Sequence, residues 1–289
     1  MVDLILGIDG GGTSCRAAVA GAHNIIGRGK SGASNILTDP DTALIHIEAA
    51  ARAALEDAGM DGDDISRAKV LLGVAGSNAG AATRYVLDRL PFAQSAIESD
   101  GLIALQGALG DQDGAVAILG TGSIFIVRRG GTVRYFGGWG FVIGDLGSGA
   151  WLGRALLQEM LLAYDAVHPS SALTDAILAR FDGDPRAAVE FARTARPNDF
   201  ARFAPLVFEY AEQGDAVGVT LLKAAAVTID ESLDRTFTEG ADRLCLLGGL
   251  SSLYTPWLAE RHRARVIEPK ADALTGAVEL ARTRFTGAA

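Results

Sequence analysis

Two glycine-rich turns, each preceded by an apolar run, are the segments of this chain best suited to hold phosphate. The first turn combines an acid, three glycines and a hydroxyl residue, namely Asp9, Gly10, Gly11, Gly12 and Thr13. Glycines adopt positive φ without steric cost, and their N–H groups can face a concavity that suits phosphate oxygens. Asp9 supplies a carboxylate of the kind that holds Mg²⁺ beside substrate phosphates. A hairpin turn without a ligand is the alternative, because Asp and Gly are ordinary hairpin residues.

The second turn repeats this scheme. An apolar run over residues 115–119 enters it, a β-branched run leaves it, and a Gly130-Gly131 hairpin leads to a third strand. The turn itself consists of Gly120, Thr121, Gly122 and Ser123. Weak self-similarity between residues 6–19 and 117–127 predicts two related halves. The first turn is neither a Walker A loop nor a dinucleotide fingerprint, because no Lys-Ser or Lys-Thr pair follows its glycines and no helix signal follows the turn.

The elements that must position these turns follow an α/β pattern. In the first half, apolar runs and helical periodicity predict four strands and three helices, and a further strand between the second strand and the first helix is left open. The strands are expected over 4–8, 15–19, 69–75 and 96–99, and the helices over 42–58, 80–89 and 101–109. Residues 27–39 are expected to form a loop.

The second half begins after a break at 110–114. It is expected to contain a three-stranded meander within 115–136, a glycine-dense loop at 137–149 and a series of helices. The remaining expected elements are helices over 150–164, 171–181, 185–193, 200–212, 215–238, 253–261 and 272–284, and strands over 242–249 and 264–267. We therefore predict two α/β domains, residues 1–110 and 111–289, with the terminal helix at 272–284 free to pack back on the first domain.

Composition narrows the classes of function. The 289 residues are 49% hydrophobic, which is ample for a large core, and the net charge of −9 comes without a basic stripe, so nucleic acid is not an expected partner. Cys15 and Cys245 fall in expected strands and are interpreted as small buried apolar residues rather than as a disulfide or metal site. The four histidines form no ligand pattern. Neither a signal peptide nor a long apolar run is present, so we expect a cytoplasmic protein without a membrane partner.

Four glycine-punctuated signals stand in chain order: IDGGGT (8–13), SDG (99–101), GTGS (120–123) and LLGGLS (246–251). This ordered set resembles the sugar kinase/Hsp70/actin superfamily. Three further segments, SGASNI (31–36), GGWG (137–140) and GDLGSG (144–149), resemble the N-acetylglucosamine kinase branch of the BadF/BadG ATPase family. Finer features at 91–93, 203–208 and 270–277 are most similar to bacterial glucosamine kinases.

The resemblance covers nearly the whole chain. It implies an α/β fold of two duplicated RNase H-like (actin-like ATPase) domains, with ATP, Mg²⁺ and a sugar bound in an interdomain cleft. On the nucleotide side, Gly10–Thr13 and Gly120–Ser123 correspond to the two phosphate hairpins, and Asp9 to the metal side. Gly248 and Gly249 correspond to the turn that meets adenosine, with an ordinary strand-to-helix turn as the alternative.

On the sugar side, the resemblance implies that Asp100 is the general base, although an Asp before a helix is also a favoured N-cap. Asn35 corresponds to a sugar-contacting amide, with a turn-forming Asn as the alternative. Gly138, Trp139 and Gly140 correspond to a sugar-side loop, in which Trp139 could instead pack in the core. Asp145 corresponds to a second sugar carboxylate, and Leu146 follows it where the family often has Glu. The N–H groups of Ser148 and Gly149 could serve an anion or simply begin a helix.

Three functional hypotheses follow. The first is ATP-dependent phosphorylation of an amino sugar, glucosamine to glucosamine 6-phosphate, with N-acetylglucosamine as the alternative substrate. The second is an ATPase that activates iron–sulfur dehydratases, which needs cysteines that share a cluster across a dimer. Only Cys15 and Cys245 are present, and this counts against it. The third is a non-catalytic ATP-binding or regulatory protein. A homodimer is left open.

Overall fold

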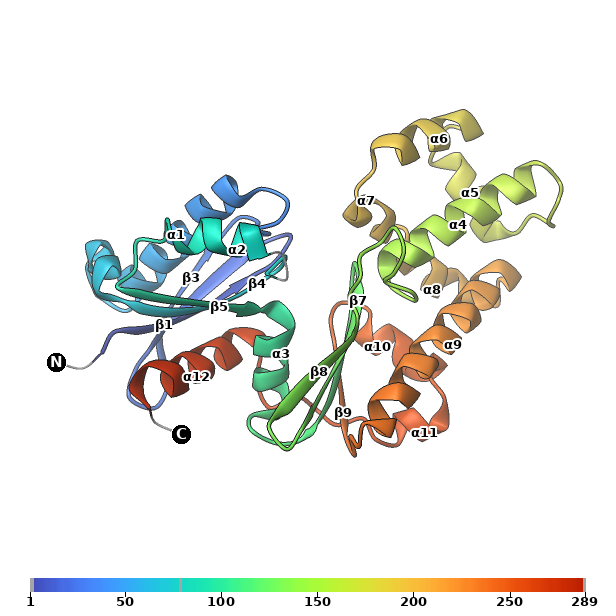
Figure 1. Ribbon diagram of the computed structural model, residues 1–289. Helices are drawn as coiled ribbons and strands as arrows, with labels where there is room; N and C mark the ends of the chain where they lie inside the picture. Colours follow the sequence, from blue (N-terminus) through green and yellow to red (C-terminus); the bar gives the residue numbers. More distant parts are fainter. Residues whose placement is uncertain (1–2, 78–79, 288–289) are drawn as a thin grey trace. The chain divides into compact units, whose positions relative to one another are not determined.

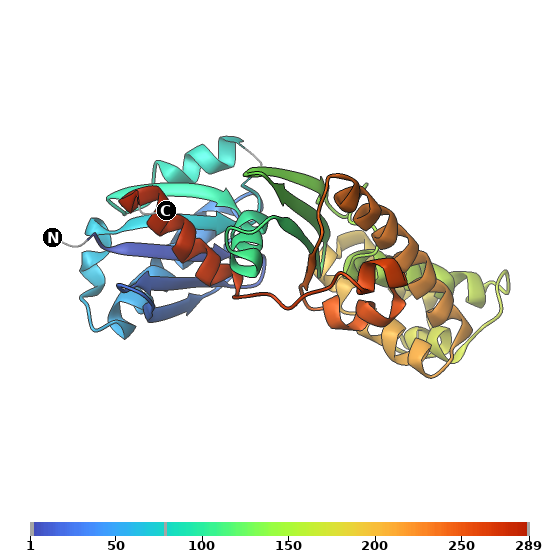
Figure 2. The ribbon, with the colours of Figure 1, turned by 90° about the horizontal axis from the view of Figure 1, so that it is seen from below.

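The structure is a computed structural model that describes residues 3–77 and 80–287. It divides into two compact units (Figures 1 and 2). One unit consists of Met1–Gln112 and Glu268–Ala289, and the other of Asp113–Ile267. The C-terminal segment therefore belongs to the same unit as the N-terminal residues.

The first unit is built on a five-stranded mixed sheet with the order β3-β2-β1-β4-β5. β1 pairs with β2 antiparallel and with β4 parallel, and β4 pairs with β5 parallel. The parallel strands β1, β4 and β5 therefore end at the same edge of the sheet. The elements of this unit are β1 (Ile5–Gly10), β2 (Cys15–Ala20), β3 (Ile25–Ser31), α1 (Pro40–Asp57), the 3₁₀ helix η1 (Gly62–Arg67), β4 (Lys69–Val74), α2 (Gly80–Leu87), β5 (Gln94–Ser99), α3 (Asp100–Leu109) and α12 (Ala273–Thr286).

Helices cover both faces of this sheet, as Figures 1 and 2 show. Successive side chains of a strand point to opposite faces. Leu6 of β1 accordingly packs in one core with Ile47 of α1. Its neighbour Ile5 packs in a second core with Ile103 of α3 and Ala277 of α12.

Strand β3 corrects the sequence-based expectation of a loop over residues 27–39, since residues up to Ser31 are extended and paired with β2. The glycines that indicated a loop are needed for packing. A Cβ atom at Gly29 would lie 2.1 Å from the carbonyl oxygen of Ala50 in α1. Only glycine lets α1 approach this strand so closely.

Helix α12 packs directly on α3 and β1. A Cβ at Gly276 would lie 2.1 Å from the carbonyl oxygen of Ile103 in α3, and a Cβ at Gly7 would lie 2.5 Å from the backbone nitrogen of Val278. These backbone approaches leave no room for side chains. They fix the position of α3, whose first residue is Asp100.

The second unit repeats the strand order of the first on a smaller scale. Its four-stranded sheet has the order β8-β7-β6-β9, with β6 and β9 parallel and the other pairs antiparallel. The elements are β6 (Gly114–Leu119), β7 (Ser123–Arg129), β8 (Thr132–Gly137), α4 (Gly149–Tyr164), α5 (Ala172–Ala179), α6 (Pro185–Thr194), α7 (Pro197–Ala201), α8 (Ala204–Glu212), α9 (Ala216–Thr238), β9 (Leu244–Leu247), α10 (Ser251–Tyr254), the 3₁₀ helix η2 (Thr255–Trp257) and α11 (Glu260–Arg263).

The core of the second unit lies between one face of its sheet and the helices. Leu119 of β6 and Phe125 of β7 pack there with Leu152 of α4, Phe208 of α8 and Ile229 of α9. The α/β fold with two duplicated sheets, predicted from the repeated turns, is confirmed. Among the described residues, no helix combines the length and the apolar character needed to cross a bilayer.

Three expected elements of the second unit differ in the structure. The single helix expected over 200–212 is divided into α7 and α8, and the helix expected over 253–261 is divided into α10, η2 and α11. In both cases a proline, Pro205 or Pro256, lies near the break and lacks the N–H that a continuous helix requires. The strand expected over 264–267 is reduced to an isolated bridge between Val266 and Leu244.

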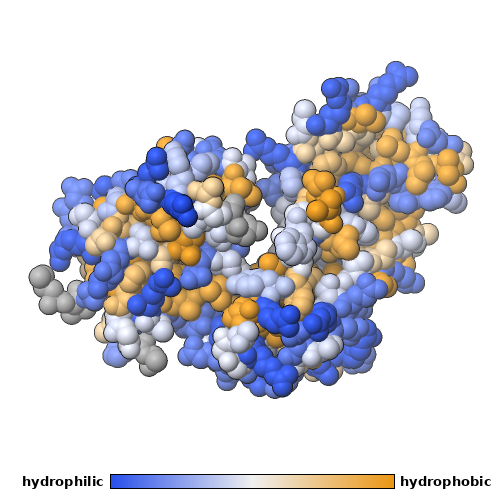
Figure 3. Space-filling model, viewed as in Figure 1, coloured by the Kyte–Doolittle hydropathy of each residue, from blue (hydrophilic) through white to orange (hydrophobic). Residues whose placement is uncertain are grey.

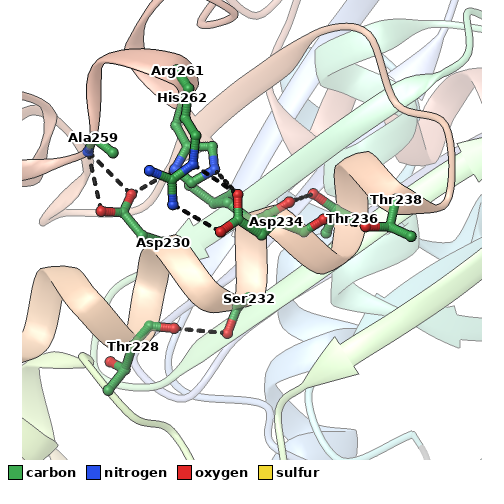
Figure 4. A network of polar contacts seen from close by, with 10 residues as sticks. Thr228, Asp230, Ser232, Asp234, Thr236, Thr238, Ala259, Arg261 and His262 are labelled. Carbon is green, nitrogen blue, oxygen red and sulfur yellow. Dashed lines mark hydrogen bonds and ion pairs between the residues drawn. The ribbon is translucent and has the colours of Figure 1, made fainter.

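A buried histidine joins α9 to α11 (Figure 4). His262 is 1% exposed, with Nδ1 2.6 Å from Asp230 Oδ1 and Nε2 2.8 Å from Asp234 Oδ1. The ring stacks on Phe237. Asp230 also accepts the N–H of Ala259 at the start of α11. This network fixes the short C-terminal helices of the unit against its longest helix.

Candidate active site

The glycine turn after β1 is closed by a hydrogen bond from the N–H of Gly11 to the carbonyl oxygen of Ser14, at 2.9 Å. None of its three glycines has a positive φ, so the turn does not use the conformational freedom that glycine offers. The room around each Cα distinguishes these glycines instead. A Cβ at Gly10 would lie 2.6 Å from Ser34 Oγ, whereas a Cβ at Gly12 would meet nothing within 4 Å. Gly12 and the following Thr13 are exposed, so the tip of this turn is open to a ligand.

Three loops at this edge of the first sheet are joined through their backbones. The N–H of Ser34 donates to Gly11 O at 2.9 Å, and the N–H of Ala75 donates to Gly10 O at 2.8 Å. The N–H of Ile36 in turn donates to Ala75 O at 3.1 Å. The glycine turn, the SGASNI segment and the end of β4 therefore form one connected surface.

Asn35 lies in this connected surface and is half-buried. Its Oδ1 accepts the N–H groups of Leu37 at 3.0 Å and of Thr38 at 3.2 Å, so the turn-forming role is present. Its amide nitrogen has no partner among residues 3–77 and 80–287 and can still donate to a ligand. The turn-forming and ligand-binding interpretations of Asn35 are compatible, since they use different atoms.

Asp9 is held by a cation that the sequence interpretation did not identify. Arg16 lies directly opposite Asp9 in the β1–β2 register, and its Nε and Nη2 donate to Asp9 Oδ2 at 3.1 and 2.5 Å. Arg16 Nη1 also donates to Oδ2 of Asp272, the N-cap of α12, at 3.2 Å. A signal for this pair was available, because residues 9 and 16 are equally distant from the middle of the hairpin turn.

The first unit fits a magnesium ion that arrives with a nucleotide. The ion pair uses Oδ2 of Asp9 and leaves Oδ1 outside it. Within the described part of the chain, no three His, Cys, Asp or Glu side chains form a cluster able to hold an ion. Mg²⁺ often takes only one or two protein carboxylates and completes its shell with water and phosphates, which is what a lone Asp9 beside a phosphate turn can offer.

Asp100 is the first residue of α3, immediately after β5. The N-cap is Ser99, whose Oγ accepts the N–H of Leu102 at 3.0 Å. Asp100 Oδ1 accepts the N–H of its neighbour Gly101 at 2.9 Å. Burial among surrounding atoms raises the pKa of Asp100 above 3.8, the charge of Asp9 also raises it, and the Gly101 N–H opposes the shift. Asp100 is therefore not needed as a cap, and its carboxylate is close enough to Asp9 for their charges to interact.

The second glycine turn, after β6, is fixed by the start of α4. The N–H of Gly120 donates to Gly122 O at 3.0 Å. The carbonyl groups of Gly120 and Thr121 accept the N–H groups of Gly149 at 2.8 Å and of Ala150 at 3.1 Å. The expectation that the N–H of Gly149 could serve an anion is wrong, because that N–H is used inside the protein.

The same holds for Ser148. Its N–H donates to Asp145 O at 3.0 Å, and its Oγ caps α4 by accepting the N–H of Trp151 at 3.2 Å. Ser148 thus begins the helix. A second residue that sequence reasoning missed is Asn198, whose Oδ1 accepts Thr121 Oγ1–H at 2.7 Å. Nothing in the local sequence indicated this contact, since the two residues lie 77 positions apart.

Asp145 lies over the second glycine turn. A Cβ at Gly122 would be 2.7 Å from Asp145 Oδ2, so glycine at 122 makes room for the carboxylate. Asp145 has a positive φ of 51°, which is uncommon for a residue with a side chain. Its Oδ1 accepts the N–H of Gly140 at 3.3 Å. Burial raises the pKa of Asp145, while backbone N–H groups of Gly140 and Ser123 oppose the shift.

The loop that delivers Asp145 also presents Trp139, which is 77% exposed. Packing of Trp139 in the core is therefore excluded. Gly138 and Gly140 on either side have φ of 70° and 86°, conformations that favour glycine. The loop is attached to β7 where the N–H of Gly138 donates to Ser123 O at 2.9 Å, while Ser123 Oγ donates to Leu146 O at 2.9 Å.

The Gly248-Gly249 turn lies against the end of β6. Gly248 has φ of 93°, and a Cβ there would be 2.3 Å from the carbonyl oxygen of Leu119. That same oxygen accepts the N–H of Leu250 at 3.0 Å. A Cβ at Gly249 would meet no atom within 4 Å, so this side of the turn is open.

The predicted residues thus form two groups, one in each unit. In the first unit the structure brings together the acidic and glycine residues at the ends of β1 and β5 with the SGASNI loop. In the second unit it brings together the turn after β6, the loop 137–147 and the turn after β9. Each group combines open glycine backbone with a carboxylate whose pKa is raised by burial, Asp100 in one and Asp145 in the other.

The chain is similar to known proteins over nearly its whole length. The sequence profile of the BadF/BadG/BcrA/BcrD ATPase family matches residues 6–281. Glucosamine kinase GspK of Vibrio cholerae serotype O1 is 36% identical over 278 residues, which cover 96% of this chain and 95% of the relative.

Two solved structures are similar over nearly the whole chain. A protein from Chromobacterium violaceum, provisionally named an N-acetylglucosamine kinase, superimposes with a TM-score of 0.90 and 31% identity, covering 97% of this chain and 99% of the other. A ROK family glucokinase from Streptomyces griseus, in complex with glucose and AMPPNP, has a TM-score of 0.59 and 20% identity, covering 97% and 99%. The second likeness concerns the fold alone.

Proposed function

The chain belongs to the BadF/BadG/BcrA/BcrD ATPase family, and on that premise we propose that it is an ATP-dependent amino-sugar kinase that converts glucosamine to glucosamine 6-phosphate. The main support is the 36% identity to a glucosamine kinase across 96% of this chain. Both glycine turns and both carboxylates described above lie within residues 6–281, which match the family profile.

Asp100 is the proposed general base. A carboxylate that accepts the proton of the O6 hydroxyl makes that oxygen a better nucleophile toward the γ-phosphorus of ATP, and ADP leaves as the new P–O bond forms. A raised pKa brings a carboxylate closer to the operating pH and improves it as a proton acceptor. Among the described residues, the donors to the Asp100 carboxylate are backbone N–H groups, those of Gly101 and of Asp100 itself, so the carboxylate remains able to accept from a substrate.

The glycine turns are the proposed phosphate sites. Gly12 and Gly249 have open space where a Cβ would stand, which lets phosphate or ribose atoms approach the backbone. Bound Mg²⁺ would neutralise charge that develops on the phosphates. Asp9 is the residue proposed to hold it, and Arg16 would orient the Asp9 carboxylate through their hydrogen bonds. Because little covalent chemistry falls to the protein in phosphoryl transfer, positioning by these backbone and carboxylate groups accounts for most of the proposed catalysis.

Sugar selection is assigned to Asn35, Asp145 and the exposed Trp139. The Asn35 amide nitrogen can donate to a sugar hydroxyl. Asp145 offers an acceptor that suits the amino group of glucosamine, and the face of Trp139 suits the apolar face of a pyranose. N-acetylglucosamine is the second candidate, favoured by the similarity to the Chromobacterium violaceum protein.

A coupled assay of ADP release tests the proposal. Glucosamine, N-acetylglucosamine, glucose and N-acetylmuramic acid are compared at equal concentration, with a control that lacks sugar. We expect the highest kcat/KM with glucosamine and little ADP without sugar, because closure on the sugar should exclude water. If ADP release is equally fast without any sugar, the kinase assignment is wrong. If N-acetylglucosamine is the better substrate, the kinase assignment stands and the choice of sugar is wrong.

The alternative of an iron–sulfur ATPase activator has a separate test. Both cysteines are buried and free in the structure, and burial raises the pKa of Cys15 to about 11, so this thiol is a poor source of thiolate. A colourless purified protein without iron is expected. A brown protein with stoichiometric iron would support the activator instead.

A further inference from the structure

An apolar cavity lies wholly within the second unit. It has a volume of about 610 Å³ and is bordered by α4, α6, α7 and residues 141–142 of the loop that carries Asp145. This volume is within the range of small-molecule sites. Its walls include Phe141, Leu157, Leu161, Val189, Ala192 and Phe200. In Figure 3 apolar surface is visible on this unit, where Figure 1 places α4 and α6.

One cation borders this apolar space. Arg154 is the single charged residue among the described residues that line the cavity. Its Nε atom is out of contact with solvent and has no hydrogen-bond partner in the described structure. The guanidinium carbon of Arg154 lies 5.2 Å from the ring centroid of Phe141. Among residues 3–77 and 80–287, Arg154 forms no ion pair, so this cation–π contact is the one interaction that partly balances its charge. A buried donor without a partner costs about 1–3 kcal/mol, so the Nε–H group of Arg154 is unsatisfied in the free protein.

The acids on neighbouring elements do not neutralise Arg154, because they are engaged elsewhere. Glu159 of α4 is 2.8 Å from His168 Nδ1. Glu190 of α6 is 3.1 Å from Arg193 Nη1. Asp199 of α7 accepts the backbone N–H of Arg196 at 2.9 Å. The cavity therefore combines apolar walls with one uncompensated positive charge.

We propose that this cavity is a binding site for an amphipathic monocarboxylate, with its carboxylate on Arg154 and its aliphatic or aromatic body against the apolar walls. The planar guanidinium matches a carboxylate in a two-bond geometry. A single cation balances a single negative charge, whereas a phosphate dianion would retain an unmatched charge in a chain of net charge −9. An amine or a neutral apolar molecule would leave Arg154 unsatisfied. The proposal does not rest on the proposed kinase activity, although Phe141 and Val142 of the loop that carries Asp145 border the cavity.

Calorimetry with two matched probes tests the proposal. 4-Phenylbutyrate carries the carboxylate, and 4-phenylbutan-1-ol has the same body with a neutral end. Hydrogen bonds to charged groups contribute about 1.5–3 kcal/mol, so the acid should bind at least about tenfold more tightly than the alcohol. In ¹H–¹⁵N spectra the acid should also shift the Nε–H signal of Arg154, assigned by its loss in Arg154→Lys.

Two variants make the test specific. Arg154→Met removes the charge and keeps an apolar side chain, so acid binding should fall to the level of the alcohol while alcohol binding persists, which also shows that the cavity is still folded. Ala192→Trp at an exposed position of the cavity wall should abolish binding of both probes. Equal affinities of acid and alcohol, or acid binding that survives Arg154→Met, would overturn the proposal.

Sedimentation velocity tests whether a second copy of the chain occupies the cavity instead of a small molecule. If the wild type is a dimer that Ala192→Trp dissociates, and neither probe binds to the wild type, the cavity is a contact between two copies of the chain. That result would also overturn the proposal. Failure of the kinase assay has no bearing on any of these measurements, because none of them uses sugar or ATP.

Discussion

Replacement of Asp100 by asparagine separates the catalytic interpretation of this residue from a structural one. Asparagine keeps the size of the side chain and an oxygen that can accept the Gly101 N–H, which Asp100 Oδ1 accepts at 2.9 Å. It cannot take up a proton from a sugar hydroxyl. Loss of a general base lowers turnover by roughly 10²–10⁴-fold, and a hundredfold loss corresponds to about 2.7 kcal/mol in activation free energy. We expect kcat of Asp100→Asn to fall at least about a hundredfold.

The effect on folding stability should be opposite to that of a lost cap. The folded state raises the pKa of Asp100, mainly through burial. Its protonated form is thus favoured on folding, and its ionised form costs free energy at pH values above the raised pKa. Neutral asparagine avoids this cost, so Asp100→Asn should leave Tm at neutral pH unchanged or higher.

Ser99→Ala is the matched control. Ser99 Oγ caps α3 through the N–H of Leu102, and loss of such a cap costs about 1 kcal/mol, which lowers Tm by about 2–4 °C. This variant should lose stability but less than about tenfold in kcat, whereas Asp100→Asn should lose kcat without stability. Coupled ADP release, ATP binding by calorimetry and differential scanning calorimetry measure the three quantities.

The wild-type pH profile provides a further check on Asp100. Its carboxylate must be ionised to accept a proton, so kcat should decline as pH falls through a pKa that lies above 3.8. A variant Asp100→Asn that turns over sugar at nearly the normal rate would refute the catalytic assignment. So would an Asp100→Asn protein that loses Tm like Ser99→Ala, since Asp100 would then act as a structural residue.

Three other predictions concern the first glycine turn, the metal and the acid limit of stability. Gly12→Ala should raise KM for ATP at least about tenfold without change in Tm, because the new Cβ meets no protein atom within 4 Å but stands where phosphate is proposed to bind. An unchanged KM would indicate that this segment is an ordinary hairpin turn without a ligand. Asp9→Asn should raise the Mg²⁺ concentration needed for half-maximal activity, and an unaltered Mg²⁺ titration would contradict the metal assignment. Asp234→Asn should lower Tm at neutral pH but not near pH 2. Arg261 and, less strongly, His262 lower the pKa of Asp234 to about 2. The stabilising charge of Asp234 is therefore fully present above its ordinary pKa of 3.8 and is lost as the pH falls through 2. Calorimetric Tm values across this pH range that show the same deficit at every pH would contradict the last prediction.

The duplicated α/β architecture could be predicted from sequence because its signals are local. An apolar run, a turn of small residues and a second run recur in both halves, and each recurrence is a strand pair in the structure. Strand β3 was left open because Gly29 indicates a loop by composition, while its actual role is to admit the backbone of α1. That requirement is a contact between segments distant in sequence, and composition does not reveal it.

The candidate site was predictable to a similar extent. Asp9 was identified from its place between a strand and three glycines, and Asp100 and Asp145 were identified from the family resemblance; the roles of all three stay predictions. The partners that tune them were not identified. Arg16 could have been found from hairpin symmetry, since it lies opposite Asp9. The placement of Asp145 over Gly122 depends on the positive φ of a loop residue and has no periodic signal.

A carboxylate lies beside each of the two glycine turns, but the two carboxylates differ in the element that carries them and in whether a cation balances their charge. This difference bears on the proposed choice of sugar. Asp9 belongs to β1, and Arg16 balances its charge. Asp145 arrives from a loop, receives backbone N–H groups, and has no cationic partner among the residues that the structure describes. A carboxylate whose pKa is raised by burial gains free energy when a cation binds beside it. The ammonium form of glucosamine is such a cation and an acetamide is not, so the unbalanced charge of Asp145 favours the free amine. Leu146, which follows Asp145, is 51% exposed and adds no second charge, so the proposed selection of the amine over the acetamide would depend on Asp145.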